Sequence, residues 1–255
     1  MPRAHGLGIN EGIFHLTHRC HNRQHLLKFA RDRNSYRSKL REALQDFEVA
    51  LLDYCLTSNH VHLLVDVADR REISGLMQKV AGETARAYNR RKGRLNAFWG
   101  DNFHATMIEG GGYLWRCLVY IELNMVRCAV VAHPKEWEWV GYHEIMGQRQ
   151  RYRLLDLERL CWRLATESID EVRRNLAWVL SQRIAEQQLQ REACWTESLA
   201  VGSPSFLGRT QPLVRSRRET QIVEATPELW TLRESHTAYG AENGLRSAAK
   251  TLKLG

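Results

Sequence analysis

The chain has 255 residues, of which 44% are hydrophobic, and a formal net charge of +8. This length allows one large domain or two small ones, and the hydrophobic content is enough to bury a core, which excludes a disordered chain. The basic excess favours a polyanionic partner, but by itself it does not separate nucleic acid from a membrane surface or simple solubility. No stretch approaches the eighteen or so apolar residues of a membrane helix, and the start MPRAHGLGINEGIF lacks the apolar core of a signal peptide, so we expect a cytoplasmic protein with no membrane partner.

Six cysteines are scattered along the chain without a CxxC pair. This spacing suggests neither a zinc ribbon nor a disulfide framework. We therefore interpret the cysteines as reduced thiols of the core.

The first half of the chain alternates between predicted strands and predicted helices. Residues 12–19 alternate weakly in polarity and predict a strand, which leads into a helix near residues 26–47. Residues 48–57 and 60–67 are β-rich runs separated by the polar pair Ser58-Asn59, which favours an antiparallel hairpin. The elements that follow are a helix from about Ile73 to Arg91, a strand over Phe103–Glu109, a break at Gly110–Gly112 and a helix from about Tyr113 to Val130.

This order, β-α-β-β-α-β-α, indicates an α+β fold, and its first six elements are typical of a ferredoxin-like domain with an antiparallel sheet and packed helices. We place a domain boundary near residue 148, with this domain over residues 1–148 and a mainly helical accessory domain over residues 149–255. In the second part, residues 158–195 predict two helices, and GSPS at 202–205 predicts a loop between helices. No catalytic pattern occurs there.

The stretch YCLTSNHVHLLV, residues 54–65, places two histidines in an apolar run. Side chains two apart on a strand share a face, so His60 and His62 point to one face and Val61 points to the other. Neutral imidazole is a common ligand of divalent metals, and with oxygen ligands and a substrate phosphate this pair would suit Mg²⁺ or Mn²⁺. Two histidines at this spacing are more often ordinary polar residues of a strand, so the triplet alone does not establish a metal site.

The helix expected after the fourth strand adds a phenol and an amide. Tyr120 and Asn124 are four residues apart and therefore lie on one helical face. A tyrosine hydroxyl beside a metal-bound phosphate can attack phosphorus and form a covalent phosphotyrosine. An ordinary packed tyrosine is the alternative, and only the combination with His60 and His62 favours the catalytic interpretation.

Two basic and polar groups are candidates for contacts with phosphates. One, in THRCHNRQ at the end of the first strand, supplies Arg19, Asn22 and Arg23; the other, at the end of the second long helix, supplies Arg90, Arg91, Lys92 and Arg94. Cations at a helix C-terminus equally well complement the helix dipole. Phe98 and Trp99 could stack on unpaired bases, although aromatic residues that enter a strand more often belong to the core.

Taken in order, the motifs GIFHLTHRCHNRQ (12–24), YCLTSNHVHLLVDV (54–67) and the segment 77–131 resemble the single-tyrosine transposases of the insertion-sequence 200 type. The resemblance, over about residues 10–145, is strongest to the REP-associated tyrosine transposases of the HUH endonuclease superfamily. It implies a domain that nicks and rejoins single-stranded DNA near a hairpin without ATP. It also implies His60 and His62 as the metal-binding histidines, Tyr120 as the nucleophile that leaves a 5′-phosphotyrosine and a free 3′-hydroxyl, and Asn124 as the third metal ligand.

Two departures from the family pattern stand out. Where relatives commonly read N-P-V-R-A-G, this chain reads NMVRCA, so Met125 replaces the proline and the glycine that would end the helix is missing. We therefore expect a longer helix here. Asp101-Asn102 stands where a basic residue is often found, which leaves the DNA contacts at that place in question.

The leading hypothesis is a metal-dependent transesterase that acts on single-stranded DNA, as a monomer or homodimer. Residues 149–255 would then help to hold the DNA or the helix that carries Tyr120; a protein-binding module is the alternative for this part. The second hypothesis is a non-catalytic DNA-hairpin-binding protein derived from a transposase. A replication-initiator nickase of the same superfamily would usually carry helicase or primase domains, and the chain has no GxxxxGK[ST] loop. Tyr113, seven residues before Tyr120 and on a similar helical face, is the natural competitor for the role of nucleophile.

Overall fold

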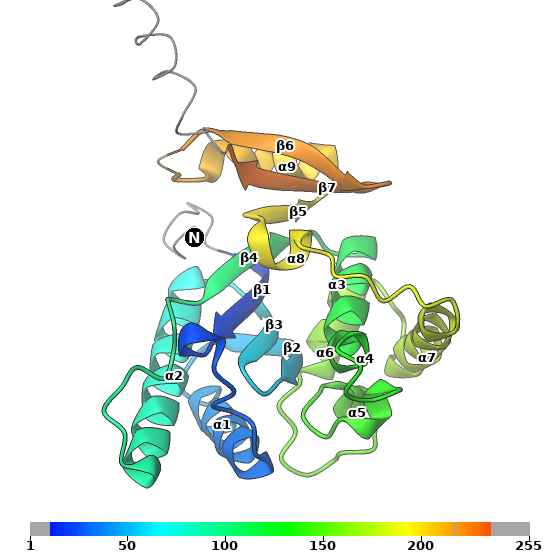
Figure 1. Cartoon of the computed structure of the whole chain (residues 1–255). Helices are drawn as coiled ribbons and strands as arrows, with labels where there is room; N and C mark the ends of the chain where they lie inside the picture. Colours follow the sequence, from blue (N-terminus) through cyan, green and yellow to red (C-terminus); the bar gives the residue numbers. More distant parts are fainter. Residues whose placement is uncertain (1–10, 217, 236–255) are drawn as a thin grey trace, which may run out of the picture.

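The computed structural model describes residues 11–216 and 218–235, and within them the chain has a mixed α+β architecture built on one seven-stranded sheet. The strands follow the order β2-β3-β1-β4-β5-β7-β6 across the sheet (Figure 1). Their bounds are β1 (Gly12–Arg19), β2 (Val49–Leu56), β3 (His60–Val67), β4 (His104–Ile108), β5 (Ala200–Gly202), β6 (Thr220–Thr226) and β7 (Leu229–Glu234).

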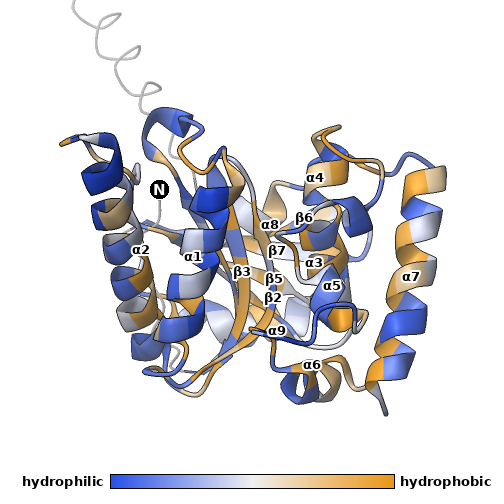
Figure 2. Cartoon of the chain, turned by 90° about the horizontal axis from the view of Figure 1, so that it is seen from below, coloured by the Kyte–Doolittle hydropathy of each residue, from blue (hydrophilic) through white to orange (hydrophobic). Residues whose placement is uncertain are grey.

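Helices cover both faces of the strands β1 to β4, as the view from below shows (Figure 2). On one face lie α1 (Ala30–Ala43) and α2 (Arg70–Lys92), which pack against each other. The other face carries α3 (Gly112–Glu122), α4 (Asn124–Arg127), α5 (Tyr142–Ile145), α6 (Leu157–Leu164), α7 (Ile169–Ala185) and α8 (Cys194–Glu197). The remaining elements are α9 (Pro204–Thr210) and the 3₁₀ turns η2 (His21–Arg23), η3 (Pro134–Glu136) and η4 (Gln211–Leu213).

The central strands place the histidines beside the end of the first strand. β1 lies between β3 and β4 and is antiparallel to both, with Thr17 paired to His62 and Arg19 paired to His60. β1 and β3 are buried along almost their whole length because helices cover both faces. The predicted element order β-α-β-β-α-β and the α+β class are thus confirmed, while the ferredoxin-like assignment stays a prediction.

The C-terminal region contains strands that the sequence pattern did not predict. The two expected helices are present as α6 and α7, but residues 200–234 add β5, β6 and β7 to the sheet. β5 runs parallel to β4, with Met107 opposite Ala200. GSPS is not a loop between helices, because Gly202 ends β5 and the hydroxyl of Ser203 caps α9 by accepting from the Phe206 amide. A three-residue strand is too short to show a period, so the expectation of a mainly helical region missed it.

The proposed boundary near residue 148 stays a prediction. Residues 236–255, which it assigned to the accessory domain, lie outside the described part of the chain. No helix of the described residues has the length and hydropathy needed to cross a membrane.

The helix expected over residues 113–130 is interrupted and shorter. α3 ends at Glu122, Leu123 leaves the helical conformation with ψ 3°, and α4 ends at Arg127. Ala129 then takes a φ of 53°, the left-handed conformation, at the place where relatives carry glycine. The expectation of a longer helix was therefore wrong: the turn is kept although an alanine there costs about 1–2 kcal/mol.

Of the aromatic pair that precedes β4, Phe98 belongs to the core and Trp99 packs against it. Phe98 is 2% exposed, and the partly buried Trp99 stacks on His18 at 4.1 Å between ring centroids and donates to the Ala81 carbonyl. The more frequent interpretation is thus confirmed for Phe98. Among the cysteines, which are all free, Cys128 is exposed and departs from the expectation of core thiols.

Candidate active site

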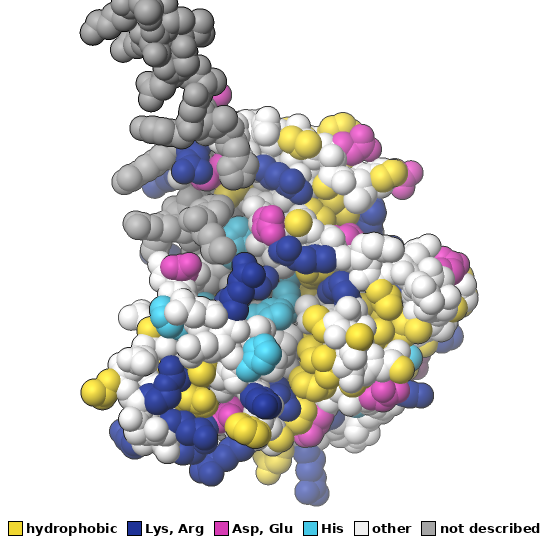
Figure 3. Space-filling view, viewed as in Figure 1, with side chains coloured by type: hydrophobic (Ala, Val, Ile, Leu, Met, Phe, Trp, Pro, Cys, Tyr) yellow, Lys and Arg dark blue, Asp and Glu magenta, His cyan; other side chains and the backbone are white. Residues whose placement is uncertain are grey.

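A cavity of about 710 Å³ opens between the ends of β1 and β3, the α3–α4 segment and residues 191–197. In the space-filling view, histidine side chains lie in a hollow near the middle of this face, with lysine and arginine side chains around it (Figure 3). The sequence-predicted residues that line the cavity are His60, His62, Tyr120, Asn124, Arg19, Asn22 and Arg23. The fold therefore brings the four predicted catalytic and metal-binding residues together with one of the two predicted basic groups.

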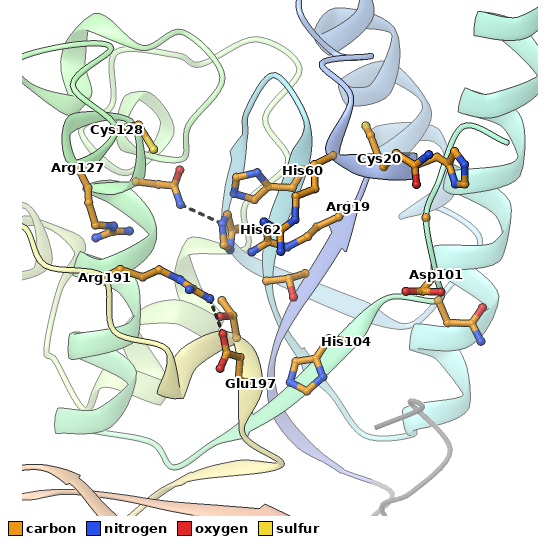
Figure 4. A pocket seen from close by; sticks show the side chains of 18 of the residues that line it. Arg19, Cys20, His60, His62, Asp101, His104, Arg127, Cys128, Arg191 and Glu197 are labelled. Atoms are coloured by element: carbon orange, nitrogen blue, oxygen red, sulfur yellow. Dashed lines mark hydrogen bonds and ion pairs between the residues drawn. The ribbon is translucent and has the colours of Figure 1, made fainter. Parts of the chain in front are cut away.

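His60 begins β3 and is oriented by its neighbours in the sequence. Its Nδ1 lies 2.7 Å from Asn59 Oδ1 and 2.9 Å from Thr57 Oγ1. Because an amide oxygen only accepts, His60 carries its proton on Nδ1, and Nε2 keeps a lone pair. Among the described residues no hydrogen bond involves Nε2, so this nitrogen is available as a ligand. His60 lies next to His62 in the cavity (Figure 4).

His62 lies beside His60, with 4.8 Å between ring centroids, and its Nε2 is 3.0 Å from Asn124 Nδ2. Asn124 Oδ1 is buried and has no hydrogen-bond partner within the described residues. Burial lowers the pKa of His60 to about 3 and that of His62 well below its ordinary value. Both rings are therefore neutral, the form that binds a metal.

These donors fit a divalent cation. Two neutral imidazoles and one amide oxygen form a mixed nitrogen and oxygen set that a substrate phosphate can complete. The unpartnered Oδ1 of Asn124 is the observation that supports this fit, since a buried amide oxygen without a partner is costly. Within the described ranges no group of three or more His, Cys, Asp or Glu residues could hold a metal, and the set here differs from such a group in that its third donor is an amide.

Tyr120 lies on α3 facing the histidines and is 5% exposed. Its ring centroid is 6.2 Å from that of His62. The Arg127 guanidinium lies 4.2 Å from the ring centroid and donates to the Tyr120 carbonyl at 3.0 Å, which holds the tyrosine in place. Burial raises the pKa of Tyr120, and the charges of Arg127 and Arg191 oppose that rise. A phenol among cations is suited to develop negative charge.

Tyr113, the competitor on the same helix, points elsewhere. Its hydroxyl donates to the Glu228 carbonyl at 3.3 Å, between β6 and β7. It does not line the cavity. The geometry therefore favours Tyr120 over Tyr113 as the group beside the histidines.

Arginines from four separate segments converge on the cavity. They are Arg19 of β1, Arg23 of η2, Arg127 of α4 and Arg191 from the chain before α8. In the close view, Arg127 and Arg191 extend toward the histidines from one side and Arg19 from the other (Figure 4). Burial and the charges of Arg191 and Arg23 lower the pKa of Arg19, so these cations repel one another in the free protein. Such a cluster favours an anion between its members.

The second predicted basic group lies away from this cavity. Arg90 and Arg91 line another cavity, of about 300 Å³, between α1 and α2, where Arg91 pairs with Asp32. Lys92 lies over Phe29, and Arg94 lies over Tyr88. The structure does not join these four cations to the histidine site, and their contact with DNA stays a prediction.

Sequence reasoning missed several residues of the site, among them His15, Arg127, Arg191 and Glu197. Alternation along β1 puts His15 on the same face as Thr17 and Arg19, so that pattern could have revealed it. Arg191 and Glu197 pair with each other at 2.5 Å in the cavity wall. No local pattern marks them, because they are more than sixty residues beyond Tyr120 in the chain.

Comparisons with known proteins agree with the resemblance. Residues 9–124 match the family model described as "Transposase IS200 like". Among solved structures, a REP-associated tyrosine transposase bound to a REP hairpin shares 16% identity at a TM-score of 0.47, with 55% of this chain and 82% of that chain covered. A transposase candidate from Deinococcus radiodurans R1 shares 15% identity at a TM-score of 0.33, with 39% and 80% covered. No curated relative matches. Residues 9–124 of this chain are thus similar to the IS200-like transposase family.

Proposed function

We propose that this chain is a metal-dependent endonuclease and transesterase that nicks and rejoins single-stranded DNA near hairpins. One observation carries the proposal: His60, His62, Asn124 and Tyr120 meet in one cavity that is surrounded by arginines. The family match supports a transposase-like role in DNA processing. The preference for a hairpin follows from the family resemblance.

His60 Nε2, His62 Nε2 and Asn124 Oδ1 would hold Mg²⁺ or Mn²⁺. When bound, the cation would polarise the scissile phosphate and offset its charge. The histidines are neutral and oriented before it arrives, so they need not lose protons to bind it.

Tyr120 Oη would attack phosphorus and form a new O–P bond, while the bond between phosphorus and the 3′-oxygen of the preceding nucleotide breaks. The phenol loses a proton to solvent and the leaving 3′-oxygen gains one, so the products are a 5′-phosphotyrosine and a free 3′-hydroxyl. Arg19, Arg127 and Arg191 would stabilise the charge that develops on the phosphate. Attack by a DNA 3′-hydroxyl would reverse the step without ATP.

The test is covalent capture of DNA. The protein is incubated with labelled single-stranded hairpin DNA and Mg²⁺ or Mn²⁺, and adducts are separated on a denaturing gel. We expect Tyr120→Phe to abolish the adduct while hairpin affinity stays within about a few fold, because the ring and its packing remain. Tyr113→Phe is the matched control on the same helix and should form the adduct normally.

The same experiment separates the alternatives. An adduct that persists in Tyr120→Phe and disappears in Tyr113→Phe would overturn the assignment of the nucleophile, and Asn124 with it. Tight hairpin binding by the wild type without any adduct would overturn the enzyme and favour a non-catalytic hairpin-binding protein.

A further inference from the structure

His15 is a buried histidine that the proposed chemistry does not use, yet it lies between a metal-binding histidine and a distant part of the chain. Its Nε2 is 2.9 Å from His62 Nδ1, and the two rings stack with 5.0 Å between centroids and 15° between planes. Its Nδ1 is 2.8 Å from the Trp195 carbonyl oxygen on α8. His15 thus joins the site to a residue 180 positions later in the sequence.

The position of each proton along this chain of contacts follows from the Trp195 carbonyl. A carbonyl only accepts, so His15 carries its proton on Nδ1. In a neutral ring Nε2 is then an acceptor, and His62 must donate to it from Nδ1. The lone pair of His62 is left on Nε2, the nitrogen that faces Asn124.

The opposite arrangement would place a charged imidazolium in the core. If His62 carried its proton on Nε2, its Nδ1 would be an acceptor, and His15 would need protons on both nitrogens. His15 is 0% exposed, so a charged ring there would be buried without the water that solvates it. A charged ring is therefore strongly disfavoured at neutral pH.

The two histidines of the pair are oriented by different parts of the chain. His60 takes its orientation from Thr57 and Asn59, which are neighbours in the sequence. His62 takes its orientation from His15 on β1 and, through it, from α8. Only one half of the site is therefore encoded locally.

We propose that His15 is a positioning residue that holds His62 with its Nε2 lone pair directed into the cavity, and that residues 194–197 set this orientation through the Trp195 carbonyl. The relevance to metal binding rests on the proposed function, whereas the tautomer of His62 does not. Contacts of this kind to metal-binding histidines typically change metal affinity about 10–100-fold when removed.

The first measurement is the tautomer of His62 in the ¹⁵N-labelled full chain, freed of metal, from long-range ¹H–¹⁵N correlations of the imidazole. We expect wild-type His62 to carry its proton on Nδ1. In His15→Phe the acceptor is lost, so the proton should move to Nε2 in a large fraction of molecules. His15→Gln should restore the wild-type tautomer, because the side-chain amide oxygen can accept from Nδ1.

The second measurement is the affinity for Mn²⁺ alone by titration calorimetry. We expect a loss of about 10–100-fold in His15→Phe and recovery in His15→Gln. His18→Phe is the matched control, because His18 is a buried histidine of the same strand whose Nε2 also bonds a backbone carbonyl, that of Asp101 at 2.9 Å. It should leave both the His62 tautomer and Mn²⁺ affinity unchanged.

Wild-type His62 protonated on Nε2 would overturn the proposal whether or not any variant folds. So would a folded His15→Phe protein with the wild-type tautomer and Mn²⁺ affinity, or an equal loss in His18→Phe. Wild-type protein that shows the expected tautomer but binds no Mn²⁺ would overturn the proposed function and leave the role of His15 in orienting His62 intact.

Discussion

The two walls of the cavity are built in different ways. The sheet wall, formed by Thr17, Arg19, His60 and His62, lies on two strands whose pairing fixes each side chain opposite a partner. The helix wall, formed by Tyr120, Asn124, Arg127 and Arg191, lies on an interrupted helix and on the distant segment before α8. The register of the strand pair fixes the positions of the proposed metal donors, whereas the position of the proposed nucleophile depends on the helix ends and on the buried groups behind them. The walls should therefore respond differently to substitution.

The largest effect should come from the sheet wall. His60→Ala or His62→Ala should lower metal-dependent cleavage by on the order of 10³-fold or more, because each removes a proposed metal donor. Hairpin affinity should change little, because the arginines remain. Cleavage and equilibrium binding are measured on the same DNA, and His25→Ala, an exposed histidine that does not line the cavity, is the control. If the double variant, His60→Ala with His62→Ala, nicks DNA as fast as the wild type, the assignment of these histidines as metal donors is wrong.

On the helix wall, Arg191→Ala should lower the cleavage rate by about 10²-fold, because Arg191 would stabilise developing charge on the phosphate. Arg90→Ala is the contrasting variant: it lies outside the cavity and should affect only affinity. If Arg90 contacts a phosphate, its removal should reduce the slope of log affinity against log salt concentration by about 1. Single-turnover rates measure the effect on cleavage, and salt titrations measure the effect on affinity. Equal cleavage rates for Arg191→Ala and Arg90→Ala would contradict the assignment of Arg191 to the cavity chemistry and of Arg90 to affinity alone.

A buried carboxyl pair, Asp53 of β2 and Glu122 at the end of α3, lies behind the helix wall. Burial raises the pKa of both well above ordinary values, and Asp53 raises that of Glu122 further. Because the pKa values of the two carboxyls are higher in the folded than in the unfolded state, their protonation stabilises the fold. This stabilisation is fully present below the ordinary carboxyl pKa values and is lost as the pH rises toward the folded pKa values.

Glu122→Gln should reduce the loss of stability that accompanies rising pH. The free energy of unfolding from urea titrations at pH 5 and 8 should fall less in the variant than in the wild type, with an upper limit of about 1.4 kcal/mol per pH unit for each titrating group. An identical slope in both proteins would show that the carboxyl is ionised in the folded state.

The smallest effect should come from the end of α4. Ala129→Gly relieves the left-handed conformation and should raise the free energy of unfolding by about 0.5–1 kcal/mol, the relief being partly offset by the greater chain entropy of glycine. Ala165, with φ 54° after α6, is a second alanine in this conformation, and Ala165→Gly should give a similar gain. Denaturant melts measure both. A loss of stability at either position would contradict the strain argument.

The contrast between the two walls also explains which parts of the site could be predicted from the sequence. His60, His62, Tyr120 and Asn124 were identifiable because each pair is separated by one period of its own element. His15, Arg191 and the strand β5 were not, since their roles depend on contacts between segments far apart in the chain. The hairpin of β6 and β7 is local, and the sequence analysis did not recognise it. The end of α4 was misjudged because Ala129 adopts a conformation that its residue type disfavours.

The pairing of β5 with β4 has a consequence for any shorter form of this protein. Without residues 149–255, β4 would become an edge strand whose free amides and carbonyls face solvent, next to the buried side chains of Ala105 and Met107. Exposed edges of this kind pair with other chains and lead to aggregation. A chain ended near residue 148 would thus keep every predicted catalytic residue and yet be prone to self-association.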